Sequence, residues 1–123
     1  MFNHVMVGTN DLATSKAFYD ATLGTLGIEA GFQDSEVRCV YRTPGGTFMI
    51  KVPIDGEPAT HGNGSTIGFA ASSSEAVDAW HAAGVANGGT AIEDPPGMRG
   101  SGVYLAYLRD PFGNKLCAAF RPA

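Results

Sequence analysis

The sequence has few cysteines, few charged residues and no long apolar run. Only Cys39 and Cys117 are cysteines among 123 residues, and charged residues make up 16%. Two distant cysteines do not form a disulfide framework, so we expect reduced thiols. No segment has the length needed to span a bilayer, and no basic stretch followed by an apolar run opens the chain. These features predict a cytoplasmic protein with no signal peptide and no membrane partner.

The chain also lacks an excess of positive charge. Eight lysines and arginines stand against 12 acidic residues, which gives a net charge of −4. Nucleic-acid-binding domains gather basic residues on one face, and no basic cluster is present here, so a nucleic acid partner is not expected. The 44% of hydrophobic residues suffices for the core of one domain at this length.

Apolar periodicity and turn residues predict a chain with many strands and two helices. Asn10 and Asp11 are good N-caps for the first helix, and Ser72-x-x-Glu75 has the spacing of a capping box for the second. The 17 glycines are spread over short connections, as many strands require. The predicted elements are strands at 2–8, 28–32, 37–43 and 48–54, helix 12–23, a linker at 55–64, strands at 65–71, 90–93, 103–109 and 115–120, and a second helix whose apolar face carries Val77, Trp80 and Ala83.

The second half of the chain repeats the pattern of the first. An offset of 62 places His4 on Thr66 and Phe18 on Trp80, and an offset of 67 places Pro44 on Pro111. A repeat of this length indicates two copies of one supersecondary unit. We therefore predict an α+β fold in which two βαβββ modules, about 1–54 and 65–123, form curved mixed sheets around a central cavity. Each helix is expected on the convex side of its sheet, within one domain at 1–123.

Two segments carry a resemblance to a known superfamily. The opening His4-Val5-x-Val7-x-x-x-Asp11-Leu12 with Phe18-Tyr19, and the closing Arg109-Asp110-Pro111-x-Gly113-Asn114-Lys115-Leu116, resemble the two ends of vicinal oxygen chelate proteins. That superfamily includes glyoxalase I, extradiol dioxygenases and bleomycin-binding proteins. The middle of the chain, from Phe69 to Gly84, resembles a lactoylglutathione-lyase-like branch. The likeness covers nearly the whole chain and is specific for the fold, but one fold of this kind hosts several reactions.

The resemblance implies a divalent metal held by a histidine on the first strand, a histidine that opens the second module and a glutamate on the last strand. Only His4 matches, because Thr66 and Cys117 occupy the other two positions and Ile50 or Lys51 stands where some relatives have a further ligand. A neutral hydroxyl and a thiol are poor substitutes for imidazole and carboxylate. We therefore expect no divalent metal at this position, while His4, Cys117 and His61 together remain a possible zinc site.

His4 and Cys117 are the candidate catalytic residues. His4 alternates with Val5 and Val7, which turns it toward the presumed pocket, where it would act as a general acid or base or donate a hydrogen bond to a ligand. The alternative is a histidine satisfied by the backbone. Cys117 is either a nucleophile with a lowered pKa or a small buried apolar residue.

Four further residues are candidate ligand contacts. These are Thr66, Lys51, Arg99 and Tyr104. Arg99 lies in the long connection 94–102, which is either a lid that brings Arg99 to an anionic group or a solvated loop. Tyr104 and Tyr107 are three residues apart on a predicted strand, so only one of them can face the cavity.

Two functions fit these observations. The first is an enzyme of the lyase or dioxygenase type with an altered metal site, which acts on or binds a small oxygenated molecule. The second is a metal-independent protein that binds and sequesters a small molecule, as bleomycin-binding relatives do. Because curved half-barrels expose sheet edges and apolar strand surface, we also expect a homodimer.

Overall fold

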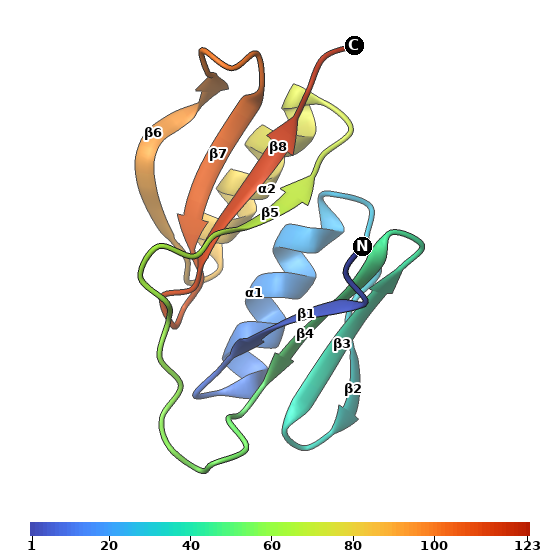
Figure 1. The fold of residues 1–123 in the computed structure, drawn as a ribbon, viewed down its shortest axis with the longest axis vertical. Helices are drawn as coiled ribbons and strands as arrows, with labels where there is room; N and C mark the ends of the chain where they lie inside the picture. The colour runs from blue at the N-terminus through green and yellow to red at the C-terminus, as the bar shows by residue number, and fades with distance from the viewer.

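The computed structural model describes residues 1–123, and the first half forms one βαβββ module. Asp11 caps the first helix by accepting a hydrogen bond from the Thr14 amide at 3.0 Å. The four strands form a mixed sheet in the order β1-β4-β3-β2, in which β1 runs parallel to β4. The elements are β1 (His4–Gly8), α1 (Leu12–Gly24), β2 (Phe32–Ser35), β3 (Arg38–Thr43) and β4 (Gly46–Lys51) (Figure 1).

The second half repeats this arrangement. Its sheet has the order β5-β8-β7-β6, and β5 is parallel to β8 as β1 is to β4. The elements are β5 (Ile67–Ala70), α2 (Ser74–Ala86), β6 (Thr90–Met98), β7 (Tyr104–Arg109) and β8 (Lys115–Phe120). Two βαβββ modules, each with a four-stranded mixed sheet, confirm the predicted fold. Neither helix is both long and apolar enough to cross a membrane.

The predicted strand at 28–32 is wrong, because β2 begins only at Phe32. After α1 the Ile28 amide bonds back to the Leu23 carbonyl at 3.1 Å, and the Gly31 amide bonds to the Asp20 carboxylate at 2.9 Å. These amides cap and brace the helix and are not available to a sheet. Gly31 also packs closely on β3, where a Cβ atom would lie 2.4 Å from the Cys39 Sγ atom.

Two other boundaries differ from the prediction. The N-cap of α2 is Ser73, which accepts from the Ala76 amide at 3.1 Å, so the capping-box prediction at Ser72 is wrong by one residue. Strand β6 continues to Met98 through a bulge between Ile92 and Gly97. Pro95 and Pro96 lie inside that bulge on an edge strand, where their missing amide protons cost no ladder bond. The expected long loop at 94–102 is therefore mostly strand.

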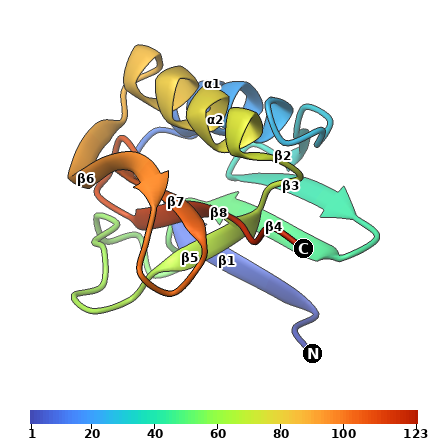
Figure 2. The same cartoon turned by 90° about the horizontal axis from the view of Figure 1, so that it is seen from above.

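Both helices cover the same side of the two sheets. Figure 2 shows α1 and α2 side by side in one layer with the strands beneath them. A single hydrophobic core lies between the layers and includes Phe18 and Tyr19 of α1, Trp80 of α2 and Ile50, Leu108 and Leu116 of the sheets, all fully buried. The other side of both sheets carries no helix, and we call it the open face.

The turn between β7 and β8 joins the two modules. The buried carboxyl of Asp110 accepts a hydrogen bond from the Tyr19 hydroxyl on α1 at 2.5 Å. Asn114 donates both to Asp110, at 2.8 Å, and to the carbonyl of Gly8 at the end of β1, at 3.2 Å. A turn of the second module thus holds a helix and a strand of the first, which fixes the geometry of the cleft between them.

Candidate functional site

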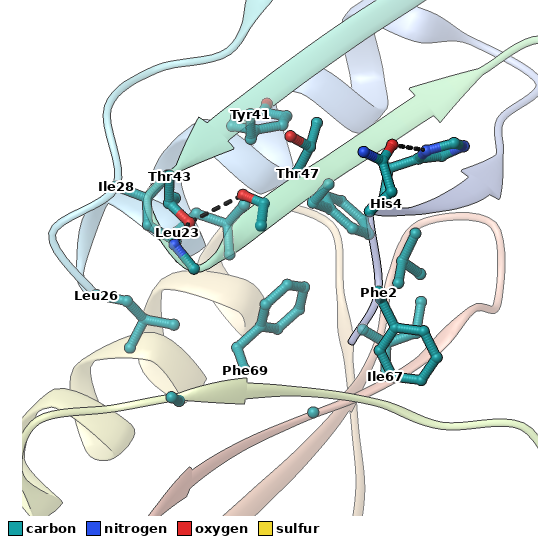
Figure 3. Close-up of a pocket in the computed structure, with 17 residues that line it drawn as sticks. Phe2, His4, Leu23, Leu26, Ile28, Tyr41, Thr43, Thr47, Ile67 and Phe69 are labelled. Carbon is teal, nitrogen blue, oxygen red and sulfur yellow. Dashed lines mark hydrogen bonds between the residues drawn. The ribbon is translucent and has the colours of Figure 1, made fainter.

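A pocket of about 400 Å³ lies where the two modules meet. It is bounded by β1, the end of α1, the β3–β4 hairpin and β5, so it exists only because the modules pack together. Figure 3 shows Leu26, Ile67 and Phe69 around the cavity, with Phe2 at its edge. A pocket of this volume is in the range that holds a small organic molecule.

Aromatic and aliphatic side chains from both modules make the walls. Phe48 of β4 and Phe69 of β5 meet edge to face, with ring centroids 5.3 Å apart. Val5 and Ile67 are equivalent residues of the two modules. Each lies on the first strand of its module and pairs with the last strand, Val5 with Phe48 of β4 and Ile67 with Leu116 of β8. Ten of the 17 lining residues are hydrophobic and none is Asp, Glu, Lys or Arg, so His4 is the one lining side chain that can carry a positive charge.

Besides Tyr41, four polar residues of the first module line the pocket, namely Asn3, His4, Thr43 and Thr47. His4 is exposed, and its Nδ1 atom donates to the side-chain Oδ1 atom of Asn3 at 2.7 Å, which leaves its Nε2 atom without a partner in the chain. The Thr43 hydroxyl donates to the Gly46 carbonyl at 2.9 Å. The Thr47 hydroxyl makes no hydrogen bond within the chain, and the Asn3 Nδ2 group makes none either. His4 and Thr47 are register partners, so their side chains extend from the face of β1 and β4 opposite to that of Val5 and Phe48.

Tyr41 contributes its ring to the pocket but not its hydroxyl. That hydroxyl donates to the carboxylate of Asp20 on α1 at 2.8 Å. Burial, aided by the hydrogen bond to Asp20, raises the pKa of Tyr41 well above its ordinary value. Burial alone would raise the pKa of Asp20, but the hydrogen bonds from Lys16, Gly31 and Tyr41 outweigh it and hold the pKa below its usual range. The cluster is an internal brace for α1.

Cys117 lies on the open face of the second module, in a charged neighbourhood. It pairs with Gly68 of β5 and is 9% exposed. Two residues before it, Lys115 forms a salt bridge with Glu93 and lies 5.1 Å from the centre of the Tyr107 ring. Burial raises the pKa of the Cys117 thiol, and the attraction of Lys115 offsets this only in part. The thiol is therefore protonated at neutral pH.

Strand register identifies the positions that correspond to the implied metal ligands. Met6 pairs with Met49 as Gly68 pairs with Cys117, so Met49 is the first-module equivalent of Cys117. Ile50 and Lys51, the two residues considered for this place, do not take it, because Ile50 is fully buried on the core side and Lys51 pairs with Gly8. The set becomes His4, Met49, Thr66 and Cys117, which contains one nitrogen donor and no carboxylate. These residues do not fit a divalent cation that prefers imidazole and carboxylate ligands.

The alternative zinc site of His4, Cys117 and His61 is not formed within one chain. No group of three or more His, Cys, Asp or Glu side chains is close enough to hold a metal ion. His61 packs instead on the β7–β8 turn, where a Cβ atom on Gly113 would lie 2.4 Å from its Nδ1 atom. The linker therefore places His61 near the start of β8, away from the residues of β1 that line the pocket.

The other predicted ligand contacts lie apart from the pocket. Arg99 donates to the carbonyls of Asp94, Pro95 and Gly97 within its own loop. The Tyr104 hydroxyl donates to Asp78 of α2 at 2.7 Å, while Tyr107 faces Lys115, so the two tyrosines do lie on opposite faces.

Two further predicted contacts, Lys51 and Thr66, also lie outside this pocket. Lys51 lines a second hollow of about 240 Å³, beside Met6 and residues 52–54. Thr66 is exposed just before β5.

Sequence analysis missed most of the pocket wall. Leu23, Leu26, Ile28, Thr43 and Thr47 were not singled out, although all line the cavity. Periodicity identifies apolar faces, but it does not tell which part of a face is left open when two modules pack. Of the candidate site residues singled out from the sequence, His4 is the one that lines this pocket.

The fold and the intermodule pocket define a class of protein, namely paired βαβββ modules that hold a small-molecule cleft at their junction. Residues 1–118 match the family described as Glyoxalase/Bleomycin resistance protein/Dioxygenase superfamily. The chain belongs to this family. A comparison with curated proteins finds no match.

Solved structures support the same placement. A glyoxalase/bleomycin resistance protein from Albidiferax ferrireducens T118 is 66% identical, with 99% of each chain covered and a TM-score of 0.96. A glyoxalase-related enzyme from Fulvimarina pelagi is 21% identical, with 99% of this chain and 88% of that chain covered and a TM-score of 0.81. A lactoylglutathione lyase from Agrobacterium tumefaciens is 18% identical over 98% and 92%, with a TM-score of 0.68. The last two likenesses concern the fold alone.

Proposed function

We propose that this protein binds a small oxygenated molecule in the intermodule pocket without a divalent metal. The observation that carries the proposal is the pocket itself, which has a volume of about 400 Å³ and is mostly apolar, with Asn3, His4 and Thr47 as the lining residues whose side chains keep a free polar group. The set His4, Met49, Thr66 and Cys117 contains one nitrogen donor and no carboxylate, which supports binding without a metal ion.

His4 is the residue that we propose to contact the ligand. Its ring is exposed and its Nε2 atom is free to accept a hydrogen bond from a hydroxyl or, when protonated, to donate one to a carbonyl. We assign no such role to Arg99 or Tyr104, since backbone carbonyls and Asp78 already take their donors. Cys117 is proposed as a small buried side chain, because its thiol is held protonated.

A homodimer remains our prediction for the assembly. The open face has no helix over it, and it presents Met6 at 48% exposure beside the hollow that Lys51 and Ile54 line. A second copy would remove this apolar surface from water. Light scattering at micromolar concentration should give twice the mass of the 123-residue chain. A monomeric mass would contradict the dimer without affecting the pocket.

The test of the function is ligand binding in the presence and absence of a chelator. We expect elemental analysis of the purified protein to find less than one zinc, nickel, manganese or iron per chain. Small aromatic alcohols and ketones should raise the melting temperature equally with and without EDTA. Stabilisation that disappears with EDTA and returns with added zinc or nickel would contradict the proposal.

An enzyme of the lyase or dioxygenase type is the second candidate. The observation in its favour is the exposed His4, at the position where the family places a functional histidine, within a chain that matches the family over residues 1–118. His4→Ala would separate the two candidates. A binding protein should keep most of its affinity for apolar ligands, whereas an enzyme that depends on this imidazole as acid or base should lose about two to four orders of magnitude in turnover.

A further inference from the structure

Two asparagines of the chain directly precede a glycine. One pair is Asn63-Gly64 in the linker between the modules, and the other is Asn87-Gly88 at the end of α2. In such a pair the asparagine carboxamide is open to attack by the next backbone nitrogen, because glycine has no Cβ atom to obstruct the approach. The remaining asparagines precede larger residues. Since the two pairs have the same chemistry, a difference between them must come from the structure around each.

The structure leaves Asn63-Gly64 unrestrained. Both residues are exposed, and neither makes a hydrogen bond to another residue of the chain. Gly64 has a φ of 98°, and a Cβ atom built on it would meet nothing within 4 Å. Figure 1 shows the linker in green between β4 and β5, as a long loop at the outside of the molecule. The Asn63 carboxamide is therefore free to turn onto the Gly64 nitrogen.

Asn87 is held by the end of α2, of which it is the C-cap. Its side-chain amide donates to the Ala83 carbonyl at 2.8 Å, and its backbone amide donates to the Gly84 carbonyl at 3.2 Å. The Gly89 amide reaches the same Gly84 carbonyl at 2.8 Å, and Gly88 has the positive φ that is common where a helix ends. The bond to Ala83 must break before the Asn87 carboxamide can reach the Gly88 nitrogen, so the helix end protects this pair.

From this difference we propose that Asn63 is a site of spontaneous deamidation, at which the protein modifies itself without an enzyme, and that Asn87 is protected from the same reaction. The Gly64 backbone nitrogen bonds to the Asn63 Cγ atom and gives up its proton. The C–N bond of the side-chain amide breaks, and ammonia leaves with that proton, which closes a five-membered succinimide ring. Water then opens the ring, and no oxidant, metal or cofactor takes part.

The ring opens in two ways, and both change the linker. Attack of water at the Cγ atom leaves aspartate, whereas attack at the main-chain carbonyl leaves isoaspartate, in which the main chain continues through the side chain. Either product adds one negative charge to a chain whose net charge is −4. Residues 60–65 make no hydrogen bond within the chain, so we expect the fold to tolerate both products. The isoaspartyl form is a substrate for a methyltransferase that recognises isoaspartyl carboxylates.

The experiment follows both asparagines in the full chain as it ages at 37 °C and pH 7.4. Protease cleavage after glutamate at mildly acidic pH places them in separate peptides, because Glu75 lies between them. Mass spectrometry then measures the deamidated fraction of each peptide. We expect this fraction to grow at least fivefold faster for Asn63 than for Asn87. Equal rates, or no growth for Asn63, would overturn the proposal.

Unfolded protein gives the matched control for the role of structure. In guanidinium chloride the end of α2 is lost, so the two pairs should deamidate at rates within about twofold of each other. If Asn87 stays unmodified in the unfolded chain, its sequence and not the helix end protects it, and the structural assignment is wrong.

Substitutions connect the isoaspartate to Asn63. Glutamine in place of asparagine would have to close a larger ring, so Asn63→Gln should be resistant, and Asn87→Gln is the matched control. After ageing, a purified isoaspartyl methyltransferase with labelled S-adenosylmethionine should label the native protein and Asn87→Gln equally, and Asn63→Gln at least fivefold less. Thermal unfolding confirms that both variants fold. Equal labelling of native protein and Asn63→Gln would contradict the assignment to Asn63.

Discussion

Tyr19 is the residue whose single hydroxyl connects the two modules. It is fully buried on α1, and its hydroxyl donates to Asp110 of the β7–β8 turn at 2.5 Å. Asp110 accepts three further hydrogen bonds, from the amides of Phe112 and Asn114 and from the Asn114 side chain. Without the Tyr19 hydroxyl, the Asp110 carboxyl would therefore still accept these three hydrogen bonds.

Tyr19→Phe should lower the free energy of unfolding by about 1–2 kcal/mol, because one buried hydrogen bond to a carboxyl is lost while the ring stays packed. Urea denaturation of both proteins at neutral pH measures the difference. An unchanged midpoint would show that the remaining donors to Asp110 compensate fully for the missing hydroxyl.

The same residue makes stability depend on pH in alkali. Burial, together with the nearby Asp110, raises the pKa of Tyr19 well above its ordinary value of 10.0. Above pH 10 the Tyr19 hydroxyl loses its proton in the unfolded chain but keeps it in the folded chain. The stability that is present below pH 10 is therefore lost as the pH rises. Each such tyrosine contributes up to about 1.4 kcal/mol per pH unit, and Tyr41 behaves in the same way. Urea midpoints between pH 9 and 11.5 should fall less steeply in Tyr19→Phe than in the native protein.

The two thiols give a test of the catalytic role first considered for Cys117. Burial raises the pKa of both Cys39 and Cys117, and Cys39 is fully buried. We expect neither to react readily with a disulfide reagent such as DTNB at pH 7.5, and both to react at once in denaturant. Rapid reaction of Cys117 in the native protein, absent in Cys117→Ala, would show a stabilised thiolate and favour a nucleophile.

At the scale of the element, helix α2 contains a glycine for packing reasons. Gly84 is buried, and a Cβ atom there would lie 2.2 Å from Leu108 Cδ1 and 3.3 Å from a ring carbon of Phe18. A Cβ atom added at Gly24, the last residue of α1, would have no neighbouring atom within 4 Å. Glycine is therefore necessary at the first position, where α2 approaches β7 closely, and replaceable at the second.

Alanine substitutions at the two glycines should have opposite signs. Gly84→Ala gains about 1 kcal/mol in helix propensity but forces Leu108 to move in a close-packed core, which costs about 1–3 kcal/mol, so we expect a net loss. Gly24→Ala is the control and should be neutral or stabilising by up to about 1 kcal/mol. Thermal unfolding of the two variants checks this, and a stabilised Gly84→Ala would show that the interface between α2 and β7 is loosely packed.

At the scale of the whole molecule, the three positions that the resemblance implies for metal ligands are spread over both modules. His4, Thr66 and Cys117 lie on β1, directly before β5, and on β8, and Cys117 keeps its register with β5. The two modules both contribute to these positions, so bringing them together depends on the arrangement of whole modules or of two chains.

The double substitution Thr66→His with Cys117→Glu should create tight zinc or nickel binding, which we do not expect in the native protein. Imidazole and carboxylate are the ligands that these ions prefer, and His4 already supplies a third donor. Calorimetric titration with each ion measures the gain, and His4→Ala in the same background is the control that should abolish it. Stoichiometric binding by the native protein through His4 would contradict the proposed metal-free mode.

Much of the architecture follows from the sequence by itself. Apolar alternation located seven of the eight strands, Asp11 was recognised as a helix cap, and the 62-residue repeat predicted two equal modules with mixed sheets. These features depend on short-range periodicity and local hydrogen bonds. The family resemblance likewise rested on segments at the two ends of the chain, and residues 1–118 match that family.

The rest was decided by contacts between distant residues. Strand β2 begins late because Gly31 bonds to Asp20 of α1, and β6 is long because Pro95 and Pro96 fit inside a bulge against β7. Met49, and not Ile50, corresponds to Cys117 because the register of β1 with β4 sets which side chains share a face. The pocket lies between β5 of the second module and β1 and the end of α1 of the first. No local pattern encodes that cavity, because its volume is the space that two separately predictable modules leave between them.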